Sequence, residues 1–177
     1  PSNPQDAYDL LIESHHLPDP VVYLEHIGLY GLRGGITGWG KSINQIVDTE
    51  AVMIRLENGD SSIGKARVVR EGEDLTIVTW GAMVHVALDA AENVSNRGIE
   101  VEVVDLRTLV PFDAETCIKS VLRTGRLIVL QESQWTGGFG HTISSRIIEE
   151  SFWGLETPPV VIGALDTPVP FSPTLED

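Results

Sequence analysis

The chain has few basic residues, a single cysteine and no long apolar run, and each shortage excludes a class of protein. Its 177 residues include 12 lysines and arginines against 26 aspartates and glutamates, for a formal net charge of −14. Nucleic acids and anionic membranes are bound by clustered basic side chains, so we expect neither as a partner. No apolar stretch approaches the roughly 20 residues that span a bilayer. A basic protein partner would suit this charge, and so would a role in solubility alone.

The cysteine and histidine residues do not have the spacing of a metal site. Cys117 has no second cysteine to pair with, and helical spacing places it near an apolar face, so we expect a reduced, buried thiol. The five histidines form no H-E-x-x-H motif, and no paired C-x-x-C or G-x-S-x-G motif occurs. His85 and His141 fall early in predicted helices, where each could serve acid–base chemistry or lie in solvent or at an interface.

From Asp74 onward, short apolar segments alternate with longer helical ones. Asp113 is the predicted N-cap of one of these helices. The predicted strands are residues 75–80, 99–106, 126–132 and 160–165, and the predicted helices are residues 83–94, 115–123 and 141–153. Such alternation predicts an α/β fold with an open, mostly parallel sheet and helices on both faces.

The first third of the chain is less regular. Asn3 before Pro4 predicts a capped helix from Pro4 to about His16. Val21–His26 has the composition of a strand, and a glycine-rich loop follows it. Ala51–Leu56 and Ile63–Val69, on either side of the turn ENGD, are predicted to be extended.

Two glycine clusters suggest phosphate binding. Gly35–Ser42 matches G-x-x-x-x-G-K-[ST], the P-loop pattern, but no strand directly precedes it and β-branched residues follow it. A P-loop-type nucleotide-binding enzyme that uses Gly35–Ser42 is therefore an alternative to a chance match. Trp135–Gly140 lies between a predicted strand and helix, where phosphate loops occur. Because Ile143 occupies the place of the third glycine, close packing of a turn is the favoured role.

Six segments occur in the order of a known family. They are VVYLEH, GKARVVREGEDLTIVTWGAMVH, VEVVDLRTLVPFD, TCIKSVLRTGRLIVLQES, TGGFG and ALDTPVPFSPTLE. In this order they resemble the C-terminal portion of the beta subunit of 2-oxoacid dehydrogenases, in its thiamine-dependent decarboxylating component. The resemblance implies that residues 1–58 are the tail of a pyrimidine-binding domain, a short helix and strand, plus a linker. Residues 59–177 would then form a transketolase C-terminal-type domain, and the chain would be part of a longer protein.

The resemblance also implies an activity, oxidative decarboxylation of a 2-oxo acid with transfer of the acyl group to a lipoyl-acyltransferase. The segments TWGAMVHV, TCIKSVLRTGRL and TGGF favour branched-chain oxo acids, with a pyruvate or acetoin dehydrogenase as the alternative. Thiamine diphosphate and Mg²⁺ would bind to the parent enzyme and not to this chain alone, because the catalytic residues would lie upstream of Pro1. We therefore assign no catalytic or cofactor-binding residue and expect the isolated chain to be inactive. The expected location is the cytoplasm, or the mitochondrial matrix in a eukaryote.

Three partners follow from the same resemblance: an alpha subunit or domain, a second beta subunit, and the subunit-binding domain of the lipoyl-acyltransferase. This docking domain is typically basic in the family. The acidic end of the chain, with Phe171, Glu176 and Asp177, would complement it, and an ordinary solvated terminus is the alternative.

Some family members bind a monovalent cation, K⁺, at the turn that here contains SHHLPDP. Ser14, His15 and Asp19 are the candidate ligands by this resemblance. Leu17 stands where the family has an aspartate, which is a departure from the family's pattern.

Overall fold

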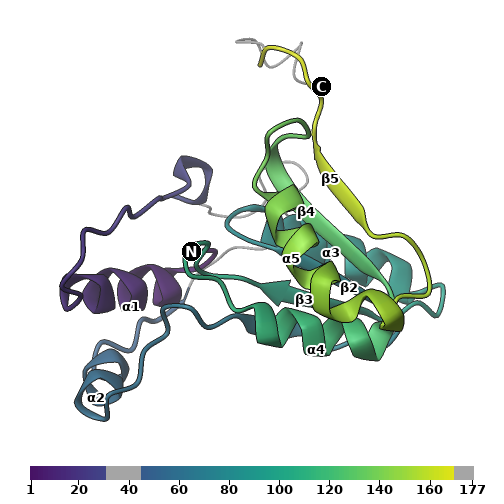
Figure 1. Ribbon diagram of the computed structural model, residues 1–177. Helices are drawn as coiled ribbons and strands as arrows, with labels where there is room; N and C mark the ends of the chain where they lie inside the picture. The colour runs from purple at the N-terminus through teal and green to yellow at the C-terminus, as the bar shows by residue number, and fades with distance from the viewer. Residues whose placement is uncertain (31–44, 170–177) are drawn as a thin grey trace.

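A five-stranded sheet forms the centre of the computed structural model, which describes residues 1–30 and 45–169 (Figure 1). The strands are β1 (Arg67–Arg70), β2 (Leu75–Thr79), β3 (Val101–Asp105), β4 (Leu127–Gln134) and β5 (Val160–Ala164). Their order is β1-β3-β2-β4-β5. β1 is antiparallel to β3 and every other pair is parallel. The predicted open, mostly parallel sheet is confirmed.

Helices cover both faces of the sheet, also as predicted. On one face, α3 (Met83–Ser95) packs Ala87 and Ala91 against Ile77, Val101 and Val103. On the other, α4 (Ala114–Thr124) and α5 (Gly140–Ser151) pack against the alternate strand residues Val78, Val104 and Val129. The short 3₁₀ turn η2 (Phe152–Gly154) continues α5. Because successive strand residues point to opposite faces, one run of apolar residues supplies both layers of the core.

The N-terminal region lies to one side of this sheet (Figure 1). It contains α1 (Pro4–His15), the 3₁₀ turn η1 (Ile27–Leu29) and α2 (Ala51–Glu57). The predicted N-cap of α1 is confirmed, since the Asn3 side chain accepts a hydrogen bond from the Asp6 amide at 3.0 Å. The predicted cap of α4 is confirmed as well, with Asp113 accepting from the Thr116 amide at 3.0 Å.

Three predictions for extended segments need correction. Val21–His26 forms no strand, because none of the described residues pairs with it and a strand needs a hydrogen-bonding neighbour. Ala51–Leu56 is not extended but lies in α2. Its alanine, methionine, leucine and arginine favour a helix, and Gly59 at φ 71° lies two residues beyond its end, so the turn ENGD terminates a helix. Of Ile63–Val69, only the part from Arg67 onward is a strand.

The glycine turn after β4 confirms the packing interpretation of Trp135–Gly140. A Cβ atom added at Gly138 or Gly140 would overlap the side chain of Gln131. That side chain accepts a hydrogen bond from the Gly140 amide at 2.6 Å. The glycines are therefore required by the close approach of Gln131. The other cluster, Gly35–Ser42, lies outside the described residues.

Candidate functional site

Helix α1 is held to the rest of the chain by carboxylates instead of apolar side chains. Asp6, Asp9 and Glu13 lie at helical spacing on one face of α1, and each is no more than 3% exposed. Their partners are arginines from distant segments. Asp6 contacts Arg67 at 2.8 Å and Arg107 at 3.0 Å. We name Asp6, Asp9 and Glu13 the acidic anchor.

The remaining contacts of the acidic anchor reach α2 and the loop after it. Arg55 lies 2.6 Å from Asp9 and 3.3 Å from Glu13. Glu13 also accepts hydrogen bonds from the Ser61 hydroxyl at 2.9 Å and from the Ser62 amide at 2.6 Å. A buried carboxylate is tolerated only when it is paired or hydrogen-bonded, and these carboxylates are. The anchor therefore fixes α1 against both α2 and the sheet.

Asp105, at the carboxyl end of β3, adds a fourth carboxylate to this region. Burial raises its pKa, although the Ser2 hydroxyl and the Arg107 amide both donate hydrogen bonds to it. Nearby, the imidazole Nε2 of His85 lies 2.7 Å from the Ser2 carbonyl oxygen. The sequence leaves open for His85 either acid–base chemistry or a place in solvent or at an interface. The structure shows it in contact with the N-terminal main chain.

Sequence reasoning did not identify the acidic anchor. Acids at three- and four-residue spacing are typical of a solvated helix face. The arginines that pair with them are between 42 and 101 residues away along the chain, so no local pattern connects the partners. In the structure, Leu10 is the only apolar buried residue of α1, which the neighbouring Leu11 and Ile12 conceal in the sequence. A helix with so narrow an apolar face needs other forces to hold it.

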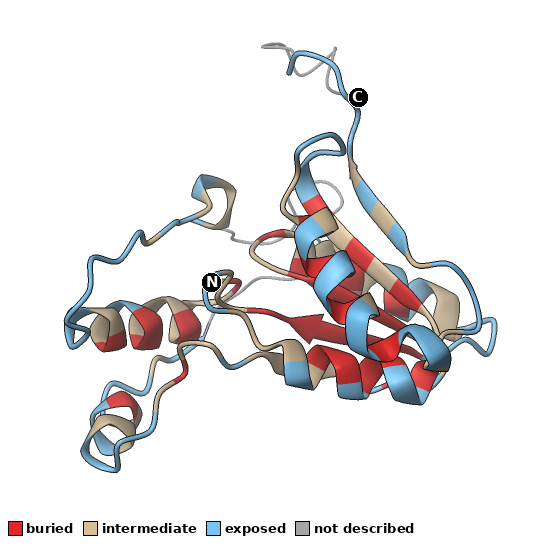
Figure 2. Cartoon of the chain, in the orientation of Figure 1, coloured by how far each residue is buried: buried red, intermediate tan, exposed pale blue. Residues whose placement is uncertain are grey.

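A second feature is the apolar segment of residues 21–27, which lies between the end of α1 and the turn η1 (Figures 1 and 2). Val22 is 84% exposed, Leu24 70% and Ile27 80%. Among its contacts, the Tyr23 hydroxyl donates to the Ala7 carbonyl at 2.6 Å, and His26 Nε2 lies 2.8 Å from the Glu132 carboxylate. Contiguous exposed apolar side chains mark interaction surfaces. We name residues 21–27 the exposed apolar segment.

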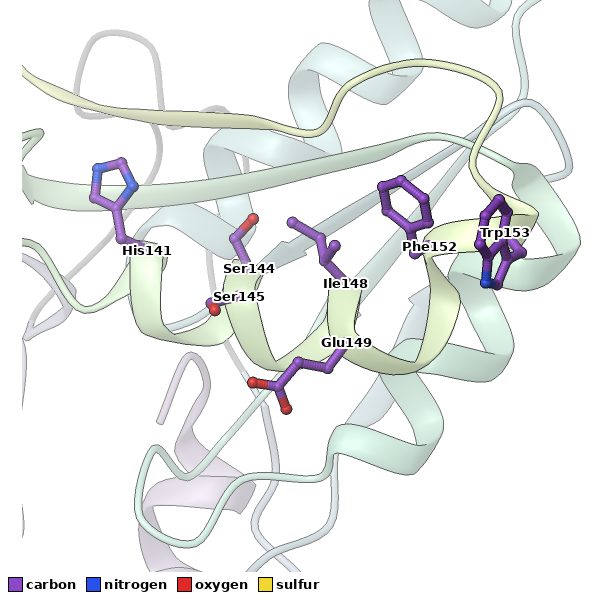
Figure 3. Close-up of a pocket in the computed structure, with 7 residues that line it drawn as sticks. All are labelled: His141, Ser144, Ser145, Ile148, Glu149, Phe152 and Trp153. Carbon is purple, nitrogen blue, oxygen red and sulfur yellow. The ribbon is translucent and has the colours of Figure 1, made fainter.

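A third feature is a groove of about 620 Å³ along α5, which we name the α5 groove (Figure 3). Its lining residues are His141, Ser144, Ser145, Ile148, Glu149, Phe152 and Trp153. At one end, His141 packs edge-on against the Trp135 ring at 4.6 Å, and its Nε2 lies 2.9 Å from the Trp135 carbonyl oxygen. This histidine therefore also contacts main chain.

The monovalent-cation ligands predicted by resemblance lie at the end of α1. The Ser14 hydroxyl donates to the Leu11 carbonyl at 2.8 Å, and the Ser14 carbonyl accepts from the Leu17 amide at 3.3 Å. His15 is the last residue of α1, and Asp19 is exposed in the turn beyond it. These contacts belong to an ordinary helix end, so the cation site stays a prediction. The predicted docking residues Phe171, Glu176 and Asp177 lie outside the described residues.

The described residues do not provide a donor set for thiamine diphosphate and its Mg²⁺. In residues 1–30 and 45–169, no three His, Cys, Asp or Glu side chains gather as metal ligands would. The most buried acids of α1 are already paired with arginines. Burial raises the pKa of the Cys117 thiol to about 12, so it is the inert thiol that the sequence predicts. We derive no catalytic step for these residues. Among the same residues, no helix has the length and apolar character needed to cross a membrane.

Comparison with known proteins identifies the fold and the family. Residues 64–177 match the family model described as "Transketolase, C-terminal domain". The chain is 44% identical over 172 residues to the "Pyruvate dehydrogenase E1 component subunit beta" of Bacillus subtilis, covering 97% of this chain and 48% of that protein. It is 40% identical over 177 residues to the "Acetoin:2,6-dichlorophenolindophenol oxidoreductase subunit beta" of Cupriavidus necator, covering 100% of this chain and 47% of that protein.

A solved structure is similar as well. A "Split gene transketolase, inactive beta4 tetramer" superposes with a TM-score of 0.53 at 32% identity, covering 64% of this chain and 36% of that one. The chain thus spans about half the length of the curated relatives it matches. From the sheet order, the two helical layers and these matches, the chain belongs to the transketolase C-terminal domain family and corresponds to the C-terminal portion of a 2-oxoacid dehydrogenase beta subunit.

Proposed function

We propose that this chain serves assembly in a thiamine-dependent dehydrogenase, in which it joins the beta subunit's other half to the partner subunits. The single observation that carries the proposal is the exposed apolar segment, a strand-like sequence with Val22, Leu24 and Ile27 in water. In this proposal residues 1–58 are the tail of a pyrimidine-binding domain, and the rest of that domain supplies the missing neighbours of the segment. In this proposal the acidic anchor fixes α1, and with it the exposed apolar segment, to the sheet.

The energetics support such a partner. Burying a side chain of this size contributes about 1.5–3 kcal/mol relative to leaving it exposed. Three such side chains in one short segment amount to a large fraction of a typical domain's stability, about 5–15 kcal/mol. An extended segment with polar contacts through Tyr23 and His26, and with its apolar side chains exposed, is suited to strand addition by another part of the protein.

The partner proteins and the substrate are proposed from the family. We propose an alpha subunit, a second beta subunit and a lipoyl-acyltransferase, with Phe171, Glu176 and Asp177 as the docking residues for the last. The preference for branched-chain oxo acids stays a prediction, and the names of the relatives support its alternative, pyruvate or acetoin. The similar split transketolase is described as an inactive tetramer, which supports an inactive, self-associating chain here.

Complementation tests this proposal. The purified chain is assayed with thiamine diphosphate, Mg²⁺ and either pyruvate, acetoin or a branched-chain 2-oxo acid, with dichlorophenolindophenol as the electron acceptor. We expect no turnover by the chain alone. Turnover should require the alpha subunit and the N-terminal half of the beta subunit of the Bacillus subtilis relative, supplied as separate chains. The substrate that is then oxidised fastest distinguishes the three substrate classes.

Variants connect this assay to the exposed apolar segment. Val22→Asp and Leu24→Asp should each reduce the complemented activity by roughly tenfold or more, because a charge would have to be buried. Ile99→Asp, at an exposed position between α3 and β3, is the matched control and should have no effect. Turnover by the chain alone, or full complementation by both segment variants, would refute the proposal.

A further inference from the structure

The turn that ends α2 contains the only Asn–Gly pair of the chain, Asn58–Gly59. Both residues are exposed. Gly59 adopts φ 71°, and a Cβ atom added there would have no neighbour within 4 Å. Because glycine has no side chain, nothing on Gly59 itself shields its amide nitrogen. The peptide bond between the two residues is therefore accessible to water.

An asparagine that precedes a glycine can react without an enzyme or a cofactor. The deprotonated amide nitrogen of Gly59 attacks Cγ of Asn58, a C–N bond forms in a cyclic succinimide, and the side-chain nitrogen leaves as ammonia. Water then adds to either carbonyl carbon and opens the ring. The product is an aspartyl residue or an isoaspartyl residue, in which the main chain runs through the former side chain. Both products carry a carboxylate where the neutral amide was.

The C-terminal cap of α2 opposes this reaction while it is closed. The Gly59 amide donates to the Leu56 carbonyl at 3.0 Å, and the Asp60 amide donates to the Arg55 carbonyl at 2.9 Å. Together these bonds form a Schellman motif, which favours glycine at the left-handed position. The Gly59 nitrogen is thus engaged in the helix end, and it can attack only after the cap opens.

Helix α2 has few contacts of its own to keep this cap closed. It is seven residues long, Val52 is its only buried residue, and no side chain caps its N-terminus. Helices of this length are marginal by themselves in water. The side chain of Arg55 supplies the missing support, since it lies 2.6 Å from Asp9 of the acidic anchor.

Glu13 of the acidic anchor contacts the chain on both sides of the Asn–Gly pair. Before the pair, its carboxylate lies 3.3 Å from Arg55. After the pair, it accepts hydrogen bonds from the Ser61 hydroxyl at 2.9 Å and from the Ser62 amide at 2.6 Å. Glu13 is 1% exposed, so water competes little for these contacts. While they persist, the cap between Arg55 and Ser61 has little freedom to open.

We propose that Asn58–Gly59 is a site of deamidation whose rate is set by the acidic anchor, and that the product loosens α1 and α2. Each opening of the anchor frees the α2 cap and allows the Gly59 nitrogen to attack. Because ammonia is lost to the solvent, the modified fraction increases with the time that the cap has spent open. The site goes beyond the proposed function and does not rest on it.

The product weakens the anchor in turn. Its carboxylate lies at the C-terminus of α2, where the helix dipole is negative, and next to the exposed Glu57 and Asp60. In the isoaspartyl form the main chain also gains a carbon atom, which displaces Ser61 and Ser62 from Glu13. Both changes favour the open cap, so a deamidated chain holds α1 and α2 less firmly.

Mass spectrometry of tryptic peptides tests the site. The purified chain is incubated at mildly alkaline pH and then digested, and a sample taken before incubation corrects for conversion during digestion. Residues 56–65 contain Asn58, and residues 71–97 contain Asn93 and Asn96 as internal controls, because valine and arginine follow them. We expect conversion of amide to acid to be about tenfold faster in residues 56–65. Asn58→Gln should abolish it.

Variants of the anchor test the control of the rate. Glu13→Ala should accelerate conversion by roughly fivefold or more, because the cap opens more often. Ser61→Ala removes only the hydroxyl contact and should accelerate it by roughly twofold, which keeps the test valid if Glu13→Ala unfolds the chain. Glu115→Ala is the matched control, since it removes an exposed carboxylate on α4 and should leave the rate unchanged.

Hydrogen exchange tests the consequence. Asn58→Asp reproduces the aspartyl product and should make exchange in α1 and α2 faster by roughly fivefold or more. Asn96→Asp is the matched control, because it makes the same change at the C-cap of α3. It should affect the last turn of α3 alone.

Three results would overturn the proposal. Equal conversion in residues 56–65 and 71–97 would exclude the site. A rate that neither Glu13→Ala nor Ser61→Ala changes would exclude control by the anchor. Unchanged exchange in α1 after Asn58→Asp would exclude the loosening. None of these results depends on the complementation assay, whose readout is substrate oxidation by the mixed subunits.

Discussion

Residues 67–164 and residues 1–30 are stabilised by different interactions. In the first region, aliphatic side chains fill the space between the sheet and its helices. In the second, the buried face of α1 carries Asp6, Asp9 and Glu13, while Val22, Leu24 and Ile27 face water. The contrast supports the proposal that residues 1–58 belong to another domain, whose remaining residues would cover the exposed apolar segment.

The largest expected difference between the regions comes from a pair of isoleucines. Ile147→Ala removes a fully buried side chain between α5 and the sheet, and it should lower the free energy of unfolding by about 2–5 kcal/mol. Ile27→Ala alters an exposed side chain and should change it by less than about 0.5 kcal/mol. Urea titration of each variant measures both values. Equal losses would show that residues 21–27 contribute to the same cooperative core.

A smaller effect should follow from breaking the acidic anchor. Glu13→Ala leaves the Ser62 amide without its acceptor and removes one of the two carboxylates that pair with Arg55, which should cost about 1–3 kcal/mol. Hydrogen exchange should then become faster in α1 and α2 and stay unchanged in β2, β3 and β4.

The control for the anchor is the exposed ion pair of Lys119 and Glu115 on α4, whose charged atoms lie 2.5 Å apart. Lys119→Ala should change neither the exchange pattern nor the melting temperature, because water screens such a pair. If Glu13→Ala leaves exchange in α1 as slow as before, apolar contacts must hold the helix instead.

The smallest effect is a difference in pH dependence between two aspartates of residues 67–164: Asp105, which contacts Ser2 of the N-terminal region, and Asp113, which caps α4. Burial raises the pKa of Asp105, while for Asp113 hydrogen bonds from Thr116 and Ala66 outweigh burial and lower the pKa. The contribution of Asp113 to the free energy of unfolding is therefore present above its unfolded pKa of about 3.9. It is lost as the pH falls through the pKa of the folded state. The contribution of Asp105 to the free energy of unfolding depends on pH in the opposite direction. It is present below about pH 3.9 and is lost as the pH rises through the higher pKa of the folded state.

Urea midpoints between about pH 3 and about pH 7 measure this difference. Asp113→Asn should reduce the loss of stability at low pH by less than about 1 kcal/mol, since the carboxylate is largely solvated. Asp105→Asn should flatten the profile at higher pH. Two variants with the same profile would contradict the opposed signs.

The same contrast explains how far the sequence was informative. Residues 75–164 were predicted well, because each helix and strand there finds its partners nearby and its periodicity reflects those contacts. Asn3 and Asp113 were identified as caps for the same reason, since a cap acts within its own first turn. The packing role of Trp135–Gly140 was also predicted correctly.

The errors lie where distant residues decide the structure. Ala51–Leu56 was predicted to be extended because of its β-branched residues, yet a helix places Val52 in a buried site and directs Arg55 toward Asp9 and Glu13. Val21–His26 has the composition of a strand and lacks a neighbouring strand among the described residues. The α5 groove could not be predicted, because a hollow depends on how η2 and α5 are placed in space.

The position of Cys117 gives the domain an intrinsic reporter. It is the only thiol of the chain, it is fully buried between α4 and the sheet, and burial raises its pKa to about 12. Alkylating reagents attack thiolates, so they can react with Cys117 only after the helix has separated from the sheet. The rate at which the thiol is alkylated under native conditions therefore reports how often this half of the protein opens, without any engineered probe.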